Sequence, residues 1–127
     1  MIAIDLTEDS KKHFQEDGFF ISENFLDDQF IPNLNKKFPK LFSGDFETGI
    51  EPDEWNWRQG RDPENVTRQI CNAWKSDNLI KDLVCHEVLG KACAELMNWT
   101  GSRLLQDNVL WKPPGGMTLA FHQDAAY

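Results

Sequence analysis

The first part of the chain carries the pattern of an amphipathic helix bounded by residues that start and stop helices. Thr7 is a favourable N-cap residue, because its hydroxyl oxygen can accept a hydrogen bond from a backbone N–H of the first turn. The acidic residues Glu8 and Asp9 follow it at the positive end of the helix dipole, and Gly18 is a typical terminator. The sequence therefore predicts a helix over residues 8–17.

A second helix is expected after Asp27 or Asp28, preceded by a short buried strand over residues 19–21. Its apolar positions lie three and four residues apart, so they share one face: Phe30, Ile31, Leu34, Phe38, Leu41 and Phe42. We expect the aromatic members of this face, Phe30, Phe38 and Phe42, in the core. Pro39 is expected to end or kink this helix, because proline has no N–H to donate to the preceding turn.

Residues 43–65 lack this periodicity and predict a long surface excursion. The segment is rich in glycine, proline and acidic residues, with one strand expected around residues 54–58. It also holds Trp55 and Trp57, which the sequence allows either as a lid over a substrate or as packed side chains.

The second half of the chain predicts helices followed by strands. After a short strand around residues 66–70, two helices are expected over 77–84 and 87–99. The pattern then changes to alternation over residues 103–112, where Asn108 shares one face with Leu104, Gln106, Leu110 and Lys112, and the other face carries Leu105, Asp107, Val109 and Trp111.

A Pro-Pro-Gly-Gly turn over residues 113–116 separates this strand from a last one expected over 118–124. Because helices come first and strands last, the sequence predicts an α+β fold within a single domain. The last strand would have no partner after it, so we expect residues 1–127 to be the N-terminal part of that domain.

Charge and composition exclude several classes of function. Lys and Arg number 13 against 21 Asp and Glu, so the formal net charge is −8, which argues against a nucleic-acid or anionic-membrane surface. No apolar run approaches the ~20 residues of a membrane span, and residues 1–10 do not resemble a secretory signal. Three cysteines without a Cys-x-x-Cys pair favour reduced thiols and a cytoplasmic location.

The strongest candidate for chemistry is His122-Gln123-Asp124. On a strand, side chains two residues apart project together, so His122 and Asp124 can face one ion. An imidazole and a carboxylate are two of the three ligands of the facial triad that binds non-haem Fe(II). The spacing also occurs by chance, and a hydrogen-bonded histidine beside a surface aspartate is the alternative.

Two segments resemble the phytanoyl-CoA dioxygenase family of Fe(II)- and 2-oxoglutarate-dependent oxygenases. In LLQDNVLWKPPGGMTLAFHQDAAY, residues 104–127, a strand ends in Lys-Pro-Pro and is followed by a turn, His-Gln-Asp and an aromatic residue, as in that family. The N-terminal stretch over residues 6–42, which begins with LTEDSKKHFQEDGFFISENFL, is similar to the family's opening helix, Asp-Gly-Phe turn and strand. The resemblance implies a double-stranded β-helix, or jelly roll, with N-terminal helices packed on one sheet, here the helical layer and the first strands.

The resemblance also implies roles for individual residues. His122 and Asp124 match the first two iron ligands, and Asn108 matches a position that borders the 2-oxoglutarate. Arg68 lies where relatives can place a Lys that reaches the same co-substrate, and a guanidinium suits a carboxylate. From the residues alone, a surface salt bridge for Arg68 and an amide satisfied by its neighbours for Asn108 stay open.

The implied activity is hydroxylation of an unactivated C–H bond in a small organic or acyl substrate, with Fe(II), 2-oxoglutarate and O₂ and without nucleic-acid or membrane partners. The family's third iron ligand, a His farther along the chain, has no counterpart in these residues. The same holds for the family's downstream Arg, which binds the distal carboxylate of 2-oxoglutarate. His13 and His86 match no ligand position. We therefore expect these 127 residues alone to be inactive and to self-associate. The alternative is a non-catalytic binding or interaction module, or an inert half-domain.

Overall fold

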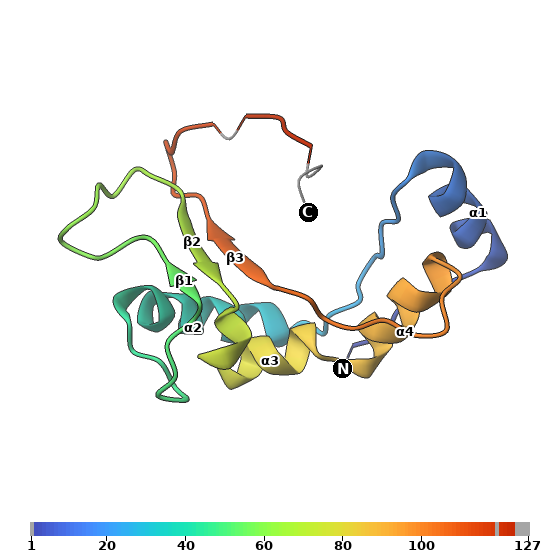
Figure 1. The fold of residues 1–127 in the computed structure, drawn as a ribbon, viewed down its shortest axis with the longest axis horizontal. Coiled ribbons are helices and arrows are strands. Elements are labelled where there is room, and N and C mark those ends of the chain that lie inside the picture. Colours follow the sequence, from blue (N-terminus) through green and yellow to red (C-terminus); the bar gives the residue numbers. More distant parts are fainter. Residues whose placement is uncertain (1, 119, 124–127) are drawn as a thin grey trace.

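Four α-helices and three short strands form the part of the chain that the computed structural model describes, residues 2–118 and 120–123. The helices are α1 (Glu8–Asp17), α2 (Phe30–Ser43), α3 (Asn78–Val84) and α4 (Glu87–Leu96), with a short 3₁₀ helix, η1 (Ala73–Lys75). The strands β1 (Glu54–Trp55), β2 (Arg68–Cys71) and β3 (Asn108–Trp111) make one antiparallel sheet in the order β1-β2-β3 (Figure 1). This combination confirms the α+β prediction.

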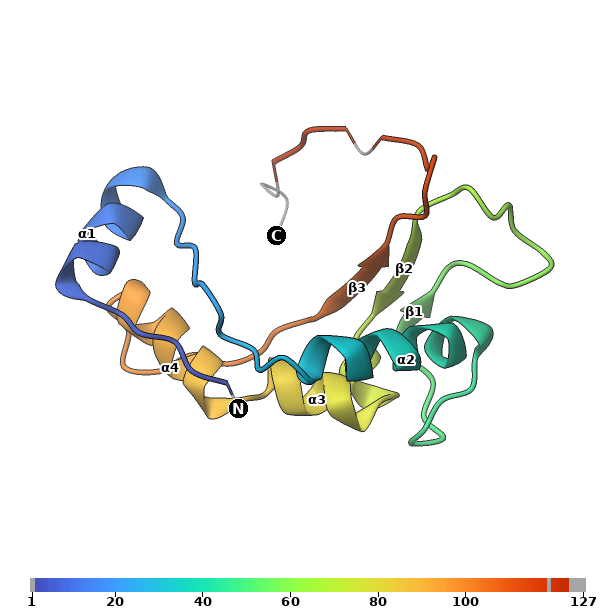
Figure 2. The same ribbon diagram turned by 180° about the vertical axis from the view of Figure 1, so that it is seen from behind.

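Helix α1 has the bounds that its capping residues predict. The Thr7 hydroxyl accepts a hydrogen bond from the Ser10 N–H at 3.1 Å, and Gly18 ends the helix with a φ of 81°. The helix lies beside α4 in both views of the molecule (Figures 1 and 2). Gln15 Nε2 donates to the Leu96 carbonyl at 2.6 Å, which links the N-terminal helix to the middle of the chain.

Helix α2 passes through Pro39 and continues to Ser43, so of the two expected effects of Pro39, an end or a kink, the end is wrong. Leu41 and Phe42 lie just beyond the proline, and their exposed fractions are 2% and 1%. Burying two such side chains is worth roughly 3–6 kcal/mol, which offsets the ~3 kcal/mol that an interior proline costs.

Two of the predicted strands are absent from the residues that the structure describes. Residues 19–21 make no strand pairing, and Phe19 and Ile21 are largely exposed rather than buried. The described residues between 118 and 123 also lie outside any strand, and Phe121 is fully exposed. In both segments apolar residue types suggested burial, but the described structure offers no neighbouring strand to complete a ladder.

The strand predicted over 103–112 is paired only where it meets the four residues of β2. The register sets Arg68 opposite Trp111 and Ile70 opposite Val109. These four residues are buried or half-buried and face the helices, whereas Asn108 and Leu110 are exposed on the other face. The predicted alternation of the two faces is confirmed for residues 107–111.

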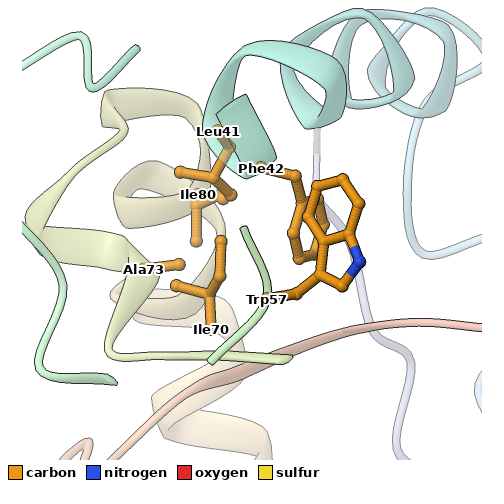
Figure 3. Close-up of a cluster of buried hydrophobic side chains, with 6 residues drawn as sticks. All are labelled: Leu41, Phe42, Trp57, Ile70, Ala73 and Ile80. Atoms are coloured by element: carbon orange, nitrogen blue, oxygen red, sulfur yellow. The ribbon is translucent and has the colours of Figure 1, made fainter. Parts of the chain in front are cut away.

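The core lies between the sheet and the helices α2 and α3. It consists of Leu41, Phe42, Trp57, Ile70, Ala73 and Ile80 (Figure 3). Trp111 of β3 closes it with an edge-on contact to Phe42 at a centroid distance of 5.4 Å. The sheet therefore has a packed face toward α2 and α3 and an open face on its other side.

In the described part of the chain, none of the helices has both the length and the apolar character needed to cross a membrane.

Candidate functional site

His122 lies in the segment that follows β3. In both views this segment lies on the opposite side of the sheet from α2 and α3 (Figures 1 and 2). The side chain is exposed, and its Nδ1 lies 3.1 Å from the carbonyl oxygen of Ala120. Asp124, the second predicted iron ligand, lies outside the described residues.

The contact to Ala120 determines which tautomer of His122 suits a metal. A carbonyl can only accept, so the hydrogen bond requires the proton on Nδ1. A neutral imidazole in that state carries its lone pair on Nε2, and metal-bound histidines commonly hold the other ring N–H on a backbone carbonyl in this way. The histidine is therefore chemically suited to be an iron ligand.

Asn108 lies on the open face of the sheet, at the start of β3. Its Oδ1 accepts a hydrogen bond from Nε2 of Gln69 at 3.0 Å, which joins two neighbouring strands on that face. For the amide oxygen of Asn108, the alternative that a neighbouring side chain satisfies it is therefore correct. The bond also orients the amide, so that its two N–H groups are the donors available for a ligand carboxylate.

Arg68 projects from the opposite, packed face of the sheet. Its exposed fraction is 8%, and its guanidinium carbon lies 3.7 Å from the ring centre of Trp57 and 4.6 Å from that of Trp111. Nη2 forms an ion pair with Glu64 Oε2 at 2.5 Å. The salt bridge that the sequence left open is thus formed, but Arg68 itself is not at the surface: it is a buried cation held between two indole rings.

The structure therefore does not bring Arg68 and Asn108 together. Side chains alternate between the two faces of a strand, and Arg68 pairs with Trp111, whereas Asn108 lies three residues before Trp111. One co-substrate on the open face can contact Asn108 but not the guanidinium behind the sheet. Gln69 and Cys71 are the β2 residues on the face of Asn108, and Gln69, to which the sequence assigned no role, is the one whose side chain bonds to Asn108.

Trp55 and Trp57 pack against the protein and do not form a lid. Trp57 is 4% exposed, and its Nε1 donates to the Pro63 carbonyl at 3.0 Å. Trp55 is half-buried and meets Phe46 edge-on at 5.1 Å between ring centres. The packing alternative is thus confirmed, and the long excursion folds inward through its aromatic residues.

The other histidines have positions on the helical part of the molecule. His86 is the N-cap of α4, where its Nδ1 accepts a hydrogen bond from the Val88 N–H at 3.2 Å, and His13 lies exposed on α1. Among the described residues, no three His, Cys, Asp or Glu side chains gather as a metal site. Asp124 is not one of those residues.

Asp107 is a buried carboxylate on the face of β3 that also carries Val109 and Trp111, and the sequence assigns it no function. It is 9% exposed, and its Oδ1 accepts from the Trp74 N–H at 3.1 Å, while Oδ2 is buried without a hydrogen-bond partner. Burial raises the pKa of this carboxyl group above its usual 3.8. An acidic residue among apolar positions of an alternating strand was the signal that could have identified it.

Comparison of the chain with family models, with curated proteins and with solved structures gave no match. Its function therefore has to be inferred from the chain's own residues.

Proposed function

We propose that the full-length protein is a cytoplasmic Fe(II)- and 2-oxoglutarate-dependent oxygenase that hydroxylates an unactivated C–H bond of a small organic or acyl substrate. Its strands would belong to a jelly roll, with α2 and α3 covering the outer face of one sheet. The open face, which carries Asn108 and Gln69, would then point toward the interior of the barrel and the reaction site.

The observation that carries this proposal is the hydrogen bond between His122 Nδ1 and its own chain at Ala120. It favours the tautomer that binds metal through Nε2, at the residue that the sequence pattern independently selects. His122 and Asp124 would hold the iron, and a third ligand has to come from outside this pair. When bound, the metal would supply activation of O₂, with 2-oxoglutarate as the reductant.

The protein's own contribution is the placement of the co-substrate. The amide N–H groups of Asn108 would donate to a carboxylate of 2-oxoglutarate on the open face, and Gln69 would hold that amide in one orientation through the 3.0 Å hydrogen bond. Arg68 is not included in this arrangement, because its guanidinium lies on the packed face.

The test is succinate release coupled to O₂ uptake by the full-length protein supplied with Fe(II) and 2-oxoglutarate. His122→Ala is expected to lower both rates by at least about a hundredfold, because one of the few protein ligands of the metal is lost. His13→Ala removes another exposed histidine from the helical part and should leave both rates unchanged. Full activity of His122→Ala would refute the assignment.

A non-catalytic interaction module is the second candidate. The observation that favours it is the exposure of large apolar side chains between the end of α4 and β3, with Trp99 58%, Leu105 89% and Leu110 56% exposed. Titration with Co(II), followed by its visible absorption, separates the two functions. A single site that is lost in His122→Ala supports the oxygenase, and no binding in the full-length protein supports the interaction module.

A further inference from the structure

A small cavity lies on the packed side of the sheet, where α2, the segment before β2, and the strands β2 and β3 meet. Its volume is about 160 Å³, and Phe42, Trp57 and Trp111 form its apolar walls. Among the described residues that line it, Arg68 is the only base, and Glu64 is the only acid. A buried cation thus borders a partly open cavity with both aromatic and polar walls, which the proposed oxygenase reaction does not use.

The guanidinium of Arg68 uses only part of its hydrogen-bonding capacity. Nε and Nη2 lie on one edge of the group and form the fork that pairs with both oxygens of a carboxylate. Nη2 contacts Glu64 Oε2, whereas Nε is buried and has no hydrogen-bond partner. An unsatisfied N–H beside an ion pair costs free energy, and a carboxylate that engages both nitrogens would remove that cost.

Glu64 is a weakly held occupant of this fork. Its side chain is 70% exposed, while that of Arg68 is 10% exposed. When Glu64 leaves, its carboxylate regains full hydration, and an incoming carboxylate restores the charge partner that the buried guanidinium of Arg68 needs. Another carboxylate that brings an apolar body can replace it and gain contacts with the aromatic walls as well.

The volume limits the size of the ligand. At about 30 Å³ for each water-sized group, 160 Å³ holds roughly five non-hydrogen atoms. Propionate and butyrate match this size, whereas 2-oxoglutarate, with ten non-hydrogen atoms, exceeds it. The cavity also lies across the sheet from Asn108, so it is separate from the proposed co-substrate position.

We propose that this cavity is a binding site for short-chain monocarboxylates, and that Glu64 acts as an internal competitor that occupies the Arg68 fork in their absence. Binding requires the carboxylate to pair with Nε and Nη2 of Arg68, the alkyl group to contact Trp57 and Trp111, and Glu64 to turn into solvent. The site needs neither iron nor 2-oxoglutarate, so it does not depend on the oxygenase proposal.

The experiment is a titration of the 127-residue chain with sodium butyrate at constant ionic strength, followed by tryptophan fluorescence and by NMR shifts of the indole N–H groups. We expect saturable binding in the millimolar range, the strength that about five or six non-hydrogen atoms can supply. Glu64→Gln removes the competing charge and should bind butyrate at least threefold more tightly. Butyramide, which has the same body without charge, should not saturate.

Arg68→Lys keeps the charge but removes the fork, and it should weaken binding at least tenfold. Arg58→Lys is the matched control, because Arg58 also stacks on an indole ring, 3.2 Å from the centre of Trp55, but lies outside the cavity. Its affinity for butyrate should equal that of the wild type. Circular dichroism of each variant establishes that it is folded.

Two results would overturn the inference: absence of saturable butyrate binding in both the wild type and Glu64→Gln, or equal binding by these two proteins. The Glu64→Gln measurement decides the matter even if Arg68→Lys does not fold. Since the titration contains no metal, its failure leaves the test of His122 unaffected, and failure of the oxygenase assay leaves this site unaffected.

Discussion

At the scale of single residues, the burial of the Asp107 carboxylate makes the stability of the folded state depend on pH. Because burial raises its pKa above 3.8, the folded state holds this proton more tightly than the unfolded state does. The contribution of the protonated Asp107 carboxyl group to the stability of the folded state is fully present below pH 3.8, and it is lost as the pH rises through the folded-state pKa. Asp107→Asn keeps an oxygen for the Trp74 N–H and removes the buried charge.

We therefore expect Asp107→Asn to gain stability relative to the wild type as the pH rises from 3.5 to 7, measured by urea unfolding at several pH values. Asp53→Asn is the control with the opposite sign, because Lys75 and Asn72 lower the pKa of Asp53. That variant should lose stability relative to the wild type near pH 7, and the loss should shrink as the pH falls. Parallel pH curves for wild type and Asp107→Asn would contradict the prediction.

Gly44 is a residue for which both the backbone and a neighbouring ring require glycine. It ends α2 with a φ of 87°, and a Cβ at this position would overlap the ring of Trp55. Gly44→Ala is expected to destabilise the protein by about 2–5 kcal/mol, combining the left-handed backbone with displacement of the ring.

Gly18→Ala separates these two causes. Gly18 has a similar φ of 81°, but nothing lies within 4 Å of the position of an added Cβ. Its cost in urea unfolding should be only about 1–2 kcal/mol, the backbone contribution alone. Equal losses for the two variants would mean that Trp55 moves aside without cost.

At the scale of elements, α2 shows that packing outweighs local preference. Pro39 cannot donate a hydrogen bond to the carbonyl of Asn35, so Pro39→Ala is expected to stabilise the protein by about 1–3 kcal/mol. Pro32→Ala is the control, because Pro32 lies in the first turn, where the backbone N–H has no partner within the helix. A gain from Pro32→Ala as large as that from Pro39→Ala in urea unfolding would contradict this explanation.

The elements that could be predicted from the sequence are those whose signals are local. Thr7 and Gly18 bound α1, and alternation identified both faces of β3, because caps and side-chain periodicity act within a few residues. The continuation of α2 past Pro39 could not be predicted, because it depends on contacts of Leu41 and Phe42 with segments far along the chain.

For the candidate site, too, only the features with local signals could be predicted from the sequence. The sequence singled out His122 and Asn108, but it could not show that Arg68 points away from Asn108, because that depends on the pairing register of β2 with β3. A shift of the register by one residue would have reversed the faces. The stacking of Arg68 between Trp57 and Trp111 likewise joins three separate segments, and no local pattern signals it.

At the scale of the whole molecule, the sheet separates two chemical environments. Its packed face holds the aromatic core, Arg68 and the small cavity, and its open face holds the amides of Gln69 and Asn108 beside an exposed Leu110. Within residues 2–118 and 120–123, β3 pairs with β2 alone, so one of its edges has no strand beside it. An unpaired edge with an apolar side chain on the adjoining face is a surface for association.

We therefore expect the 127-residue chain to self-associate through β3, with Leu110 at the contact. Leu110→Lys places a charge on this strand and should raise the dissociation constant at least about tenfold, measured by sedimentation velocity over a range of concentrations. The reason is that burying the leucine side chain at the contact is worth roughly 1.5–3 kcal/mol. Ile50→Lys is the matched control, since Ile50 has the same exposed fraction, 56%, but lies outside the sheet. A concentration-independent monomer for the wild type would refute self-association, and an equal effect of both variants would place the contact elsewhere.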